Sequence, residues 1–168
     1  LKYIYMSWLN MDIKKLAKYF NVIVILAMVL SLYLTYLHYS IEEGPCNISE
    51  DLNCDVVNKS QWSEMFGVSI ALVGFFIFLI VFIVNRFIIK DKKEFMGFDL
   101  SKKKLVTFLL LISTWNFLYS IYLLGYVSYY KLQGVYCPFC MILDLLILTM
   151  FILSIIMFKG VKNGEENT

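Results

Sequence analysis

The feature that most constrains this 168-residue chain is a set of four long apolar stretches. A helix needs about 20 mostly apolar residues to cross the hydrocarbon core of a bilayer. Each stretch meets this length, and no amphipathic segments remain that could cover four such helices in water. The sequence therefore predicts an all-α membrane protein, a four-transmembrane-helix bundle, with spans at about 17–40, 66–89, 105–129 and 138–158.

The uneven distribution of basic side chains predicts how the bundle is oriented. Thirteen of the 15 lysine and arginine residues lie before the first span, around the second connection or after the fourth span. Basic residues in short loops stay in the cytoplasm. We therefore expect a multi-pass protein of the cell membrane, with a cytoplasmic segment at 1–16, a membrane domain at 17–160 and a cytoplasmic tail at 161–168. The first and third connections then face the extracytoplasmic side.

All four cysteines fall in these two outward connections. Cys46 and Cys54 form a C-x7-C pair, and Cys137 and Cys140 form a C-x2-C pair at the head of the fourth span. Disulfides persist on the outer side of a cell membrane. The residues leave three interpretations open: two static disulfides in a non-enzymatic scaffold, a four-thiolate zinc site, and a redox relay. The C-x7-C spacing is poor for zinc, so we expect no metal.

The proline inside the second pair favours the relay. Proline suits the first position of a helix, so Cys137 would be the N-cap and Cys140 would lie in the first turn. The positive end of the helix stabilises a thiolate at this place. Residues three apart share a helical face, which brings the two sulfurs together. Such a pair is suited to reversible thiol–disulfide exchange.

The first pair lies in a different environment. Gly44 and Pro45 form a turn before Cys46, and six acidic residues of this loop outnumber its single Lys59. A turn of this kind presents its neighbour on an exposed segment. We therefore expect Cys46 to be exposed and reachable by a macromolecular partner. Electrons would then pass from a partner on the aqueous side of the membrane to a small hydrophobic oxidant in the bilayer, such as a quinone.

The two outward connections carry their motifs in a characteristic order: Cys46, then Cys54-Asp-Val-Val-Asn-Lys-Ser60-Gln-Trp62, then Phe66-Gly67, and finally Cys137-Pro-Phe-Cys140. This pattern resembles the vitamin K epoxide reductase (VKOR) family in its small prokaryotic form. The resemblance covers roughly residues 17–160, which is the whole four-helix region. It implies a membrane thiol:quinone oxidoreductase with a capping loop between its first two helices.

The resemblance also implies a role for each cysteine. Cys140 would face the quinone, and Cys137 would pair with it and exchange with Cys54. Cys46 would receive electrons from a thioredoxin-like protein, in which the enzyme generates disulfides. The quinone would be ubiquinone, menaquinone or a related compound. Because the chain ends about ten residues after the fourth span, we expect that partner to act in trans.

Other residues match positions near the family's active site. The resemblance implies quinone-binding or supporting roles for Asn58, Ser60, Trp62 and Phe139. Vertebrate relatives hold the quinone oxygens with an asparagine in the second span and a tyrosine in the fourth, and the alignment places Ile70 and Asp144 at these positions. This departure favours quinone reduction over epoxide reduction.

Asp144 lies one helical turn after Cys140, on the same face of the fourth span. An ionisable group inside a span is costly and is by default a functional hypothesis. Either Asp144 binds or protonates a quinone oxygen, or it makes a hydrogen bond to a tyrosine of a neighbouring helix, such as Tyr119 or Tyr122. The residues leave both interpretations open.

Two further polar residues are expected to be structural. Asn116 would form an interhelical hydrogen bond rather than bind a ligand, and His38 would extend toward the membrane interface rather than relay protons. The nearest alternative family is disulfide-bond formation protein B, which carries its C-x2-C motif in the first outward loop. Here that motif begins the fourth span, which favours the VKOR-type interpretation. Nothing in the sequence indicates nucleic-acid binding.

Overall fold

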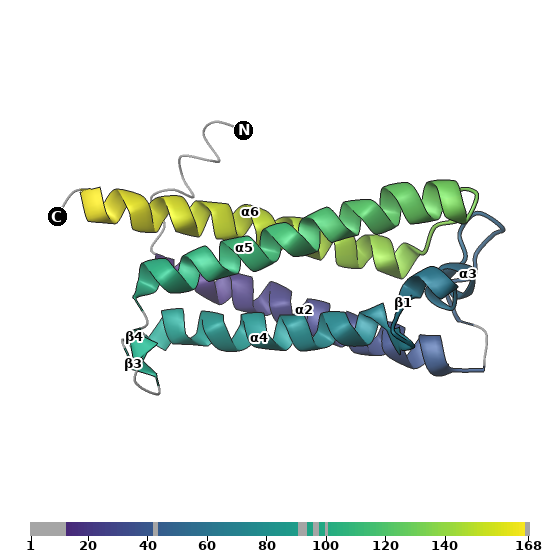
Figure 1. Ribbon diagram of the computed structural model, residues 1–168, viewed down its shortest axis with the longest axis horizontal. Coiled ribbons are helices and arrows are strands. Elements are labelled where there is room, and N and C mark those ends of the chain that lie inside the picture. The colour runs from purple at the N-terminus through teal and green to yellow at the C-terminus, as the bar shows by residue number, and fades with distance from the viewer. Residues whose placement is uncertain (1–12, 42–43, 91–93, 96–97, 100, 167–168) are drawn as a thin grey trace.

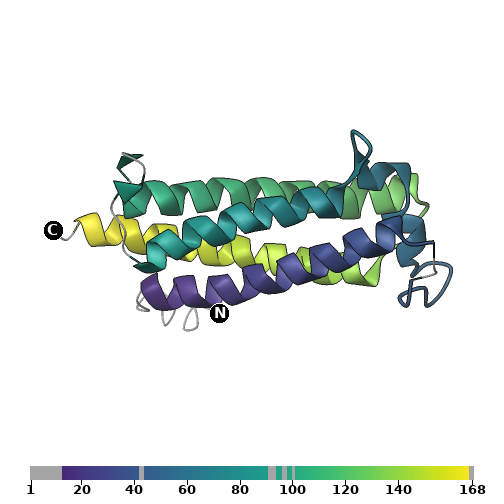
Figure 2. The same ribbon diagram turned by 90° about the horizontal axis from the view of Figure 1, so that it is seen from below.

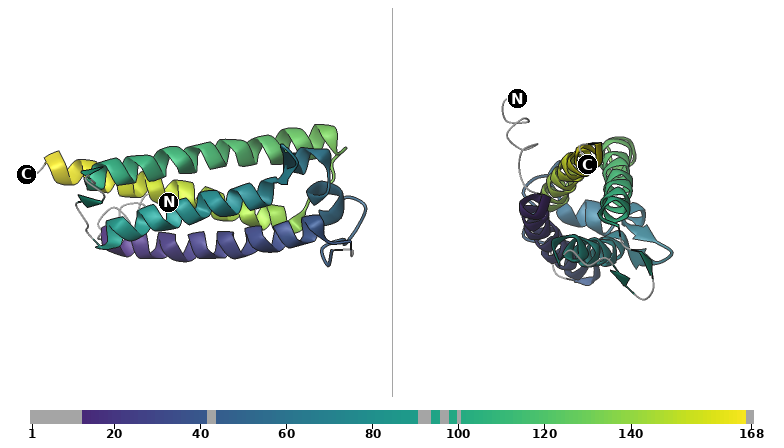
Figure 3. Two further views of the ribbon diagram at one scale, coloured as in Figure 1. Left: turned by 60° about the horizontal axis from the view of Figure 1, so that its bottom comes forward. Right: turned by 90° about the vertical axis from the view of Figure 1, so that its left-hand side faces the viewer.

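Four long helices make up the bundle that the sequence predicts. The computed structural model describes residues 13–41, 44–90, 94–95, 98–99 and 101–166. The long helices are α2 (Ile13–Tyr39), α4 (Ile70–Lys90), α5 (Lys102–Ile121) and α6 (Pro138–Glu166). They lie side by side over most of their length (Figures 1 and 2), around a common axis (Figure 3). Each belongs to a helical segment that is long and apolar enough to cross a membrane.

The third membrane helix changes its hydrogen bonding partway along. After α5 the chain continues without a break as the π-helix η2 (Tyr122–Lys131), so the whole helical segment runs from Lys102 to Lys131. A π-helix bonds each N–H to the carbonyl five residues earlier, and such segments are frequent at functional sites. Here η2 turns the side chains of Val127 and Ser128 inward, where both are buried.

The packed apolar core fills only one half of the bundle. Its largest fully buried side chains come from the first half of α2, the middle and end of α4, the start of α5 and the middle and later part of α6; they include Leu16, Phe20, Phe78, Ile88, Leu109, Met150 and Met157. The other half, where α2 ends and α6 begins, has a smaller buried cluster built around Leu34 and three cysteines. The less densely filled half is therefore the one that carries the cysteines.

A small cap between α2 and α4 covers that half. It contains α3 (Cys54–Asn58), the 3-10 turn η1 (Gln61–Ser63), and the hairpin of β1 (Glu64–Met65) and β2 (Val68–Ser69). In this hairpin Glu64 pairs with Ser69, and Met65 pairs with Val68. The expected capping loop is thus present.

The helix after the cap starts later than the apolar run suggests. Phe66 and Gly67 have φ values of 54° and 79°, so they form the turn of the hairpin. A right-handed helix cannot include such residues, and α4 accordingly begins at Ile70. Glycine adopts a positive φ at little cost, which explains why one is found at the second turn position.

The connection before α6 is attached to the cap. Leu52 and Tyr136 form a parallel bridge, in which the Asn53 N–H donates to the Tyr136 carbonyl at 3.0 Å and the Tyr136 N–H donates to the Asp51 carbonyl at 2.8 Å. These bonds bring the two cysteine-bearing segments together, although more than 80 residues separate Leu52 from Tyr136.

The opposite end of the bundle holds the start of α2, the end of α6, and the hairpin of β3 (Glu94–Phe95) and β4 (Phe98–Asp99) (Figure 1). The first and third connections thus share one end, and the second connection lies at the other, as the sequence predicts. Most of the expected N-terminal segment, residues 1–12, lies outside the described residues, as do residues 167 and 168.

Candidate functional site

The cap end brings the cysteines of both pairs together. Cys46 and Cys54 form a disulfide, whereas Cys137 and Cys140 are free thiols. The Sγ atom of Cys137 lies 3.3 Å from that of Cys54. Since α3 begins at Cys54 and α6 begins directly after Cys137, two helix starts place these sulfurs in contact. The arrangement allows thiol–disulfide exchange between the pairs with little movement.

The start of α6 has the geometry that the sequence predicts. Pro138 is the first helical residue, and the Cys140 N–H donates to the Cys137 Sγ at 3.1 Å, so Cys137 caps the helix. The hydrogen bond from the Cys140 thiol lowers the pKa of the Cys137 thiol; burial opposes this, and the N–H groups of Cys140 and Phe139 reinforce it. A lowered pKa makes this sulfur both a better leaving group and a thiolate nearer neutral pH.

The prediction that Cys46 is exposed is wrong, because its side chain is only 4% exposed. The reason is a set of hydrogen bonds around Asp55 in the first turn of α3. One oxygen of this carboxylate accepts from the Gly44 N–H at 2.9 Å and from the Asn47 side-chain amide at 2.8 Å. These bonds fold the loop against α3 and bury the sulfur that the turn at Gly44 and Pro45 was expected to present.

The charge of Asp55 is stabilised in this setting. Burial raises the pKa of its carboxyl, but the hydrogen bonds from Gly44 and Asn47 and the nearby Lys59 outweigh that cost, and the pKa is lowered overall. The Lys59 Nζ lies 3.3 Å from Asp55 Oδ1. The same carboxylate therefore neutralises a lysine and secures the loop that carries Cys46.

A cavity of about 210 Å³ lies next to the free thiols. Its lining comes from all four long helices, η2 and the cap. Most of the predicted site residues line it: Asn58, Ser60, Trp62, Ile70, Cys137, Cys140 and Asp144. Phe139 does not belong to this lining and instead packs edge-on against Tyr33, with ring centroids 5.4 Å apart. Two chain segments predicted separately therefore face one cavity.

The structure assigns different partners to two polar residues of the spans. The Ser120 hydroxyl donates to Oδ1 of Asp144, so the bonded neighbour on α5 is a serine rather than Tyr119 or Tyr122. The Asn116 amide donates to the Ile112 carbonyl of its own helix at 2.7 Å, so the predicted interhelical bond is wrong. A side-chain amide can donate a hydrogen bond to the carbonyl one turn earlier in its own helix. The sequence pattern does not distinguish this bond from one to a neighbouring helix.

His38 does not extend toward the membrane interface. Its side chain is only 5% exposed and lies between α2 and the cap; its Nδ1 is 2.5 Å from the Asn58 carbonyl oxygen and its Nε2 is 3.4 Å from Oε1 of Glu64. The expectation of a snorkelling side chain was wrong because the cap covers this end of α2. Both residues that contact the imidazole nitrogens, Asn58 and Glu64, therefore belong to the cap.

The cavity suits a quinone ring. Apolar cavities of about 150 Å³ hold a benzene molecule, and this one is larger. Ser31, which the sequence did not single out, lines the cavity with a buried hydroxyl that has no hydrogen-bond partner in the described part of the protein. Such an orphaned hydroxyl fits a ring oxygen. In the same part of the chain, no group of three or more histidine, cysteine or acidic residues could hold a metal ion.

Comparisons with known proteins agree with this geometry. The model of the vitamin K epoxide reductase family matches residues 19–155, which include all four cysteines and the cap. A comparison with curated proteins finds no match. The matched region covers most of the chain, and its fold and cysteine arrangement are those of a multi-pass thiol–disulfide oxidoreductase. The chain belongs to the vitamin K epoxide reductase family.

Proposed function

We propose that this protein oxidises the thiols of a thioredoxin-like partner and passes the electrons to a quinone in the membrane. The observation that carries the proposal is the contact of Cys137 with the Cys46–Cys54 disulfide, with both sulfurs of the inner pair lining a cavity of ring size. The partner acts from the extracytoplasmic side of the cell membrane, where we place all four cysteines.

The first stage transfers electrons from the partner to the cap. A thiolate of the reduced partner attacks Cys46, which breaks the bond to Cys54 and forms a mixed disulfide. The second partner thiol then displaces Cys46. The partner leaves with a disulfide, and its two electrons remain in the thiols of Cys46 and Cys54. Because Cys46 is buried in the closed cap, this stage requires the loop around it to open.

The second stage moves the electrons to the inner pair. Cys54 attacks Cys137 in an oxidised Cys137–Cys140 pair, and Cys140 leaves as a thiolate. Cys46 then attacks Cys54, which restores the Cys46–Cys54 disulfide and releases Cys137. The result is an oxidised cap pair and a reduced inner pair, and the pairing of Cys46 with Cys54 beside two free thiols supports this order.

The last stage takes place at the cavity. A bound quinone supplies the acceptor for the two electrons and two protons that Cys137 and Cys140 give up when they re-form their disulfide. Asp144 lies one turn below Cys140, where Ser120 holds its carboxyl oxygen in place. We assign Asp144 the role of a general acid that delivers a proton to a ring oxygen, and general acids of this kind accelerate reactions by about 10²–10⁴-fold.

The remaining predicted residues form the surroundings of the ring. Ile70 and Trp62 supply apolar wall on the cap side of the cavity, and Ser60 and Asn58 supply its polar edge. The quinone is ubiquinone, menaquinone or a related compound. Without an asparagine and a tyrosine at positions 70 and 144, epoxide reduction is not part of the proposal.

Anaerobic reconstitution tests the proposal. Reduced thioredoxin-like protein is added to the purified protein in vesicles that contain ubiquinone or menaquinone, and quinone absorbance is followed. We expect quinone reduction that Cys140→Ala abolishes and that Ser49→Ala, at an exposed position of the loop that carries Cys46, leaves unchanged. A partner variant that lacks its second thiol should accumulate as a mixed disulfide with Cys46, because nothing then displaces Cys46. Full quinone reduction by Cys140→Ala would contradict the role of the inner pair, whereas a cap disulfide that stays bonded and forms no adduct would favour a static scaffold.

A further inference from the structure

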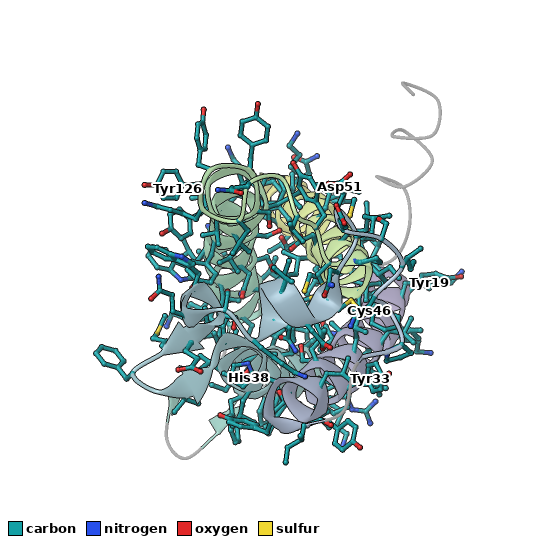
Figure 4. All side chains as sticks on the ribbon, turned by 90° about the vertical axis from the view of Figure 1, so that its right-hand side faces the viewer. Tyr19, Tyr33, His38, Cys46, Asp51 and Tyr126 are labelled. Atoms are coloured by element: carbon teal, nitrogen blue, oxygen red, sulfur yellow. A yellow bond between two sulfur atoms is a disulfide. The ribbon has the colours of Figure 1, made fainter. Side chains whose placement is uncertain are left out.

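His38 is a buried imidazole with two acceptors on opposite sides. Its Nδ1 lies 2.5 Å from the carbonyl oxygen of Asn58, and its Nε2 lies 3.4 Å from a carboxylate oxygen of Glu64. Figure 4, which views the cap end of the bundle, shows His38 where α2 meets the cap. The mechanism of electron transfer proposed above makes no use of this side chain.

The two contacts select a protonation state. A carbonyl oxygen only accepts hydrogen bonds, so Nδ1 must carry a proton. A neutral imidazole has a single N–H, which would leave the Nε2 lone pair directed at a carboxylate. The doubly protonated ring donates on both sides and carries a charge opposite to that of Glu64. The geometry therefore fits an imidazolium.

The residue that His38 contacts controls the placement of Cys54. Asn58 is the last residue of α3, a five-residue helix that begins at Cys54. Its side-chain amide donates to the Leu34 carbonyl of α2 at 2.7 Å, and its carbonyl also accepts from the Ser63 hydroxyl. Because so short a helix moves as a unit, fixing one end on α2 fixes the sulfur at the other end.

We propose that His38 is a positioning residue for the disulfide relay: its imidazolium clamps α3 between α2 and β1 and holds Cys54 against Cys137. The role in turnover rests on the proposed function. The clamp itself needs neither partner nor quinone, so it can be tested separately.

The titratable groups on the described elements around His38 are a tyrosine, an ion pair and Glu64. Tyr39, next to His38 on α2, packs edge-on against the imidazole with centroids 4.7 Å apart. On α3 the Asp55 carboxylate is 3.3 Å from the ammonium of Lys59, so these opposite charges lie together. Glu64 on β1 is the group of opposite charge in direct contact with the ring.

The test measures how well Cys54 is held against Cys137. Cys46→Ala combined with Cys140→Ala leaves these two cysteines alone, and equilibration with a glutathione buffer gives the effective concentration of one for the other. Adding His38→Gln, which retains one amide donor and cannot carry a charge, should lower this value about tenfold, the effect of one charge-assisted hydrogen bond. Tyr36→Phe, on an exposed position of the same helix, is the matched control and should change nothing.

Glu64→Gln provides the second measurement. It should give a similar loss, and the loss should not grow when both substitutions are combined, because both remove one interaction. Equal effective concentrations in the parent and in His38→Gln, or losses that add when the two substitutions are combined, would overturn the clamp. If His38→Gln does not fold, Glu64→Gln alone decides. A failure of quinone reduction in the intact protein would contradict the proposed function and leave this measurement unaffected.

Discussion

Asp144 is a carboxylate inside an apolar membrane helix, and it illustrates how much a single residue can indicate. Its spacing from Cys140 predicts that both face the same side of α6, and both line the cavity. Its partner Ser120, a small polar residue among many in the spans, could not be identified from the sequence. An unexpected acidic residue is conspicuous in an apolar run, whereas a serine is common in membrane helices because it bonds its own backbone.

Two substitutions separate a proton donor from a structural carboxylate. Asp144→Asn keeps the oxygen that accepts from Ser120 and loses the acidic proton, whereas Asp144→Leu loses both. If the carboxyl delivers a proton, both variants should reduce quinone about 100-fold more slowly, the lower range for general acid catalysis. Stopped-flow quinone absorbance measures the rates. Wild-type rates in Asp144→Asn would refute the role, and Thr149→Val, on the exposed face of α6, is the control.

Asp55 gives a prediction about pH. Its folded-state pKa is lowered, so its contribution to cap stability is complete above the ordinary carboxyl value of about 3.9 and is lost as pH falls through the folded value. A phosphine should therefore reduce the Cys46–Cys54 disulfide at a steady rate between about pH 7 and pH 5 and faster below about pH 4.

Asp55→Asn tests whether the faster reduction in acid comes from protonation of this carboxylate. Its amide would face the donor groups of Gly44 and Asn47, so the loop should open more often and reduction should be about tenfold faster near neutral pH, with little further change in acid. Asp51→Asn, an exposed acidic position of the same loop, should behave as wild type. An acid response that persists in Asp55→Asn would show that another carboxyl is responsible.

At the scale of elements, the four helices follow from apolar length alone, but their ends and pairings do not. The run that suggests a helix from residue 66 contains Phe66 and Gly67, whose positive φ values belong to a hairpin turn. The cap end of the third membrane helix is a π-helix, which apolar composition cannot distinguish from an α-helix. Local conformation at these ends depends on the cap and the neighbouring helices, which the sequence pattern does not describe.

A polar contact between α2 and α4 gives a prediction about helix pairing. The Asn85 amide, fully buried, donates to the Ala17 carbonyl at 2.7 Å and to Oδ1 of Asn21 at 2.8 Å. Hydrogen bonds of this kind between membrane helices contribute about 0.6–2 kcal/mol. Asn85→Leu should therefore lower the free energy of unfolding in detergent by about 1 kcal/mol while quinone reduction continues at the wild-type rate.

The measurement for Asn85 is steric trapping or denaturant unfolding in mixed micelles. Its control is Thr114→Val, in which the lost hydroxyl bonds only to the Leu110 carbonyl of its own helix at 2.7 Å. Equal stability of Asn85→Leu and wild type would mean that the hydrogen bonds from the Asn85 amide to α2 contribute nothing to the free energy of unfolding. A loss of activity without a loss of stability would place the residue in the reaction instead.

At the scale of the whole molecule, the bundle has a cap end with the cysteines and an opposite end with the β3–β4 hairpin (Figure 1). The basic residues predict that the hairpin end lies in the cytoplasm. A reporter enzyme that folds only with disulfides should be active when inserted after Ile48, in the cap loop, and inactive when inserted after Ser101, before α5. Activity in the reverse pattern would place the cysteines on the cytoplasmic side.

The sequence by itself determined the number of membrane helices, which connections share an end, and that both cysteine pairs lie at that end. These follow from hydrophobic length, charge bias and cysteine position, which are local properties of the chain. Only the tertiary structure decided that Cys46 is buried, that Ser120 bonds Asp144 and that His38 contacts the cap. Each of these depends on which distant segment packs against a side chain, and burial and hydrogen-bond partners arise from that packing rather than from the order of residues.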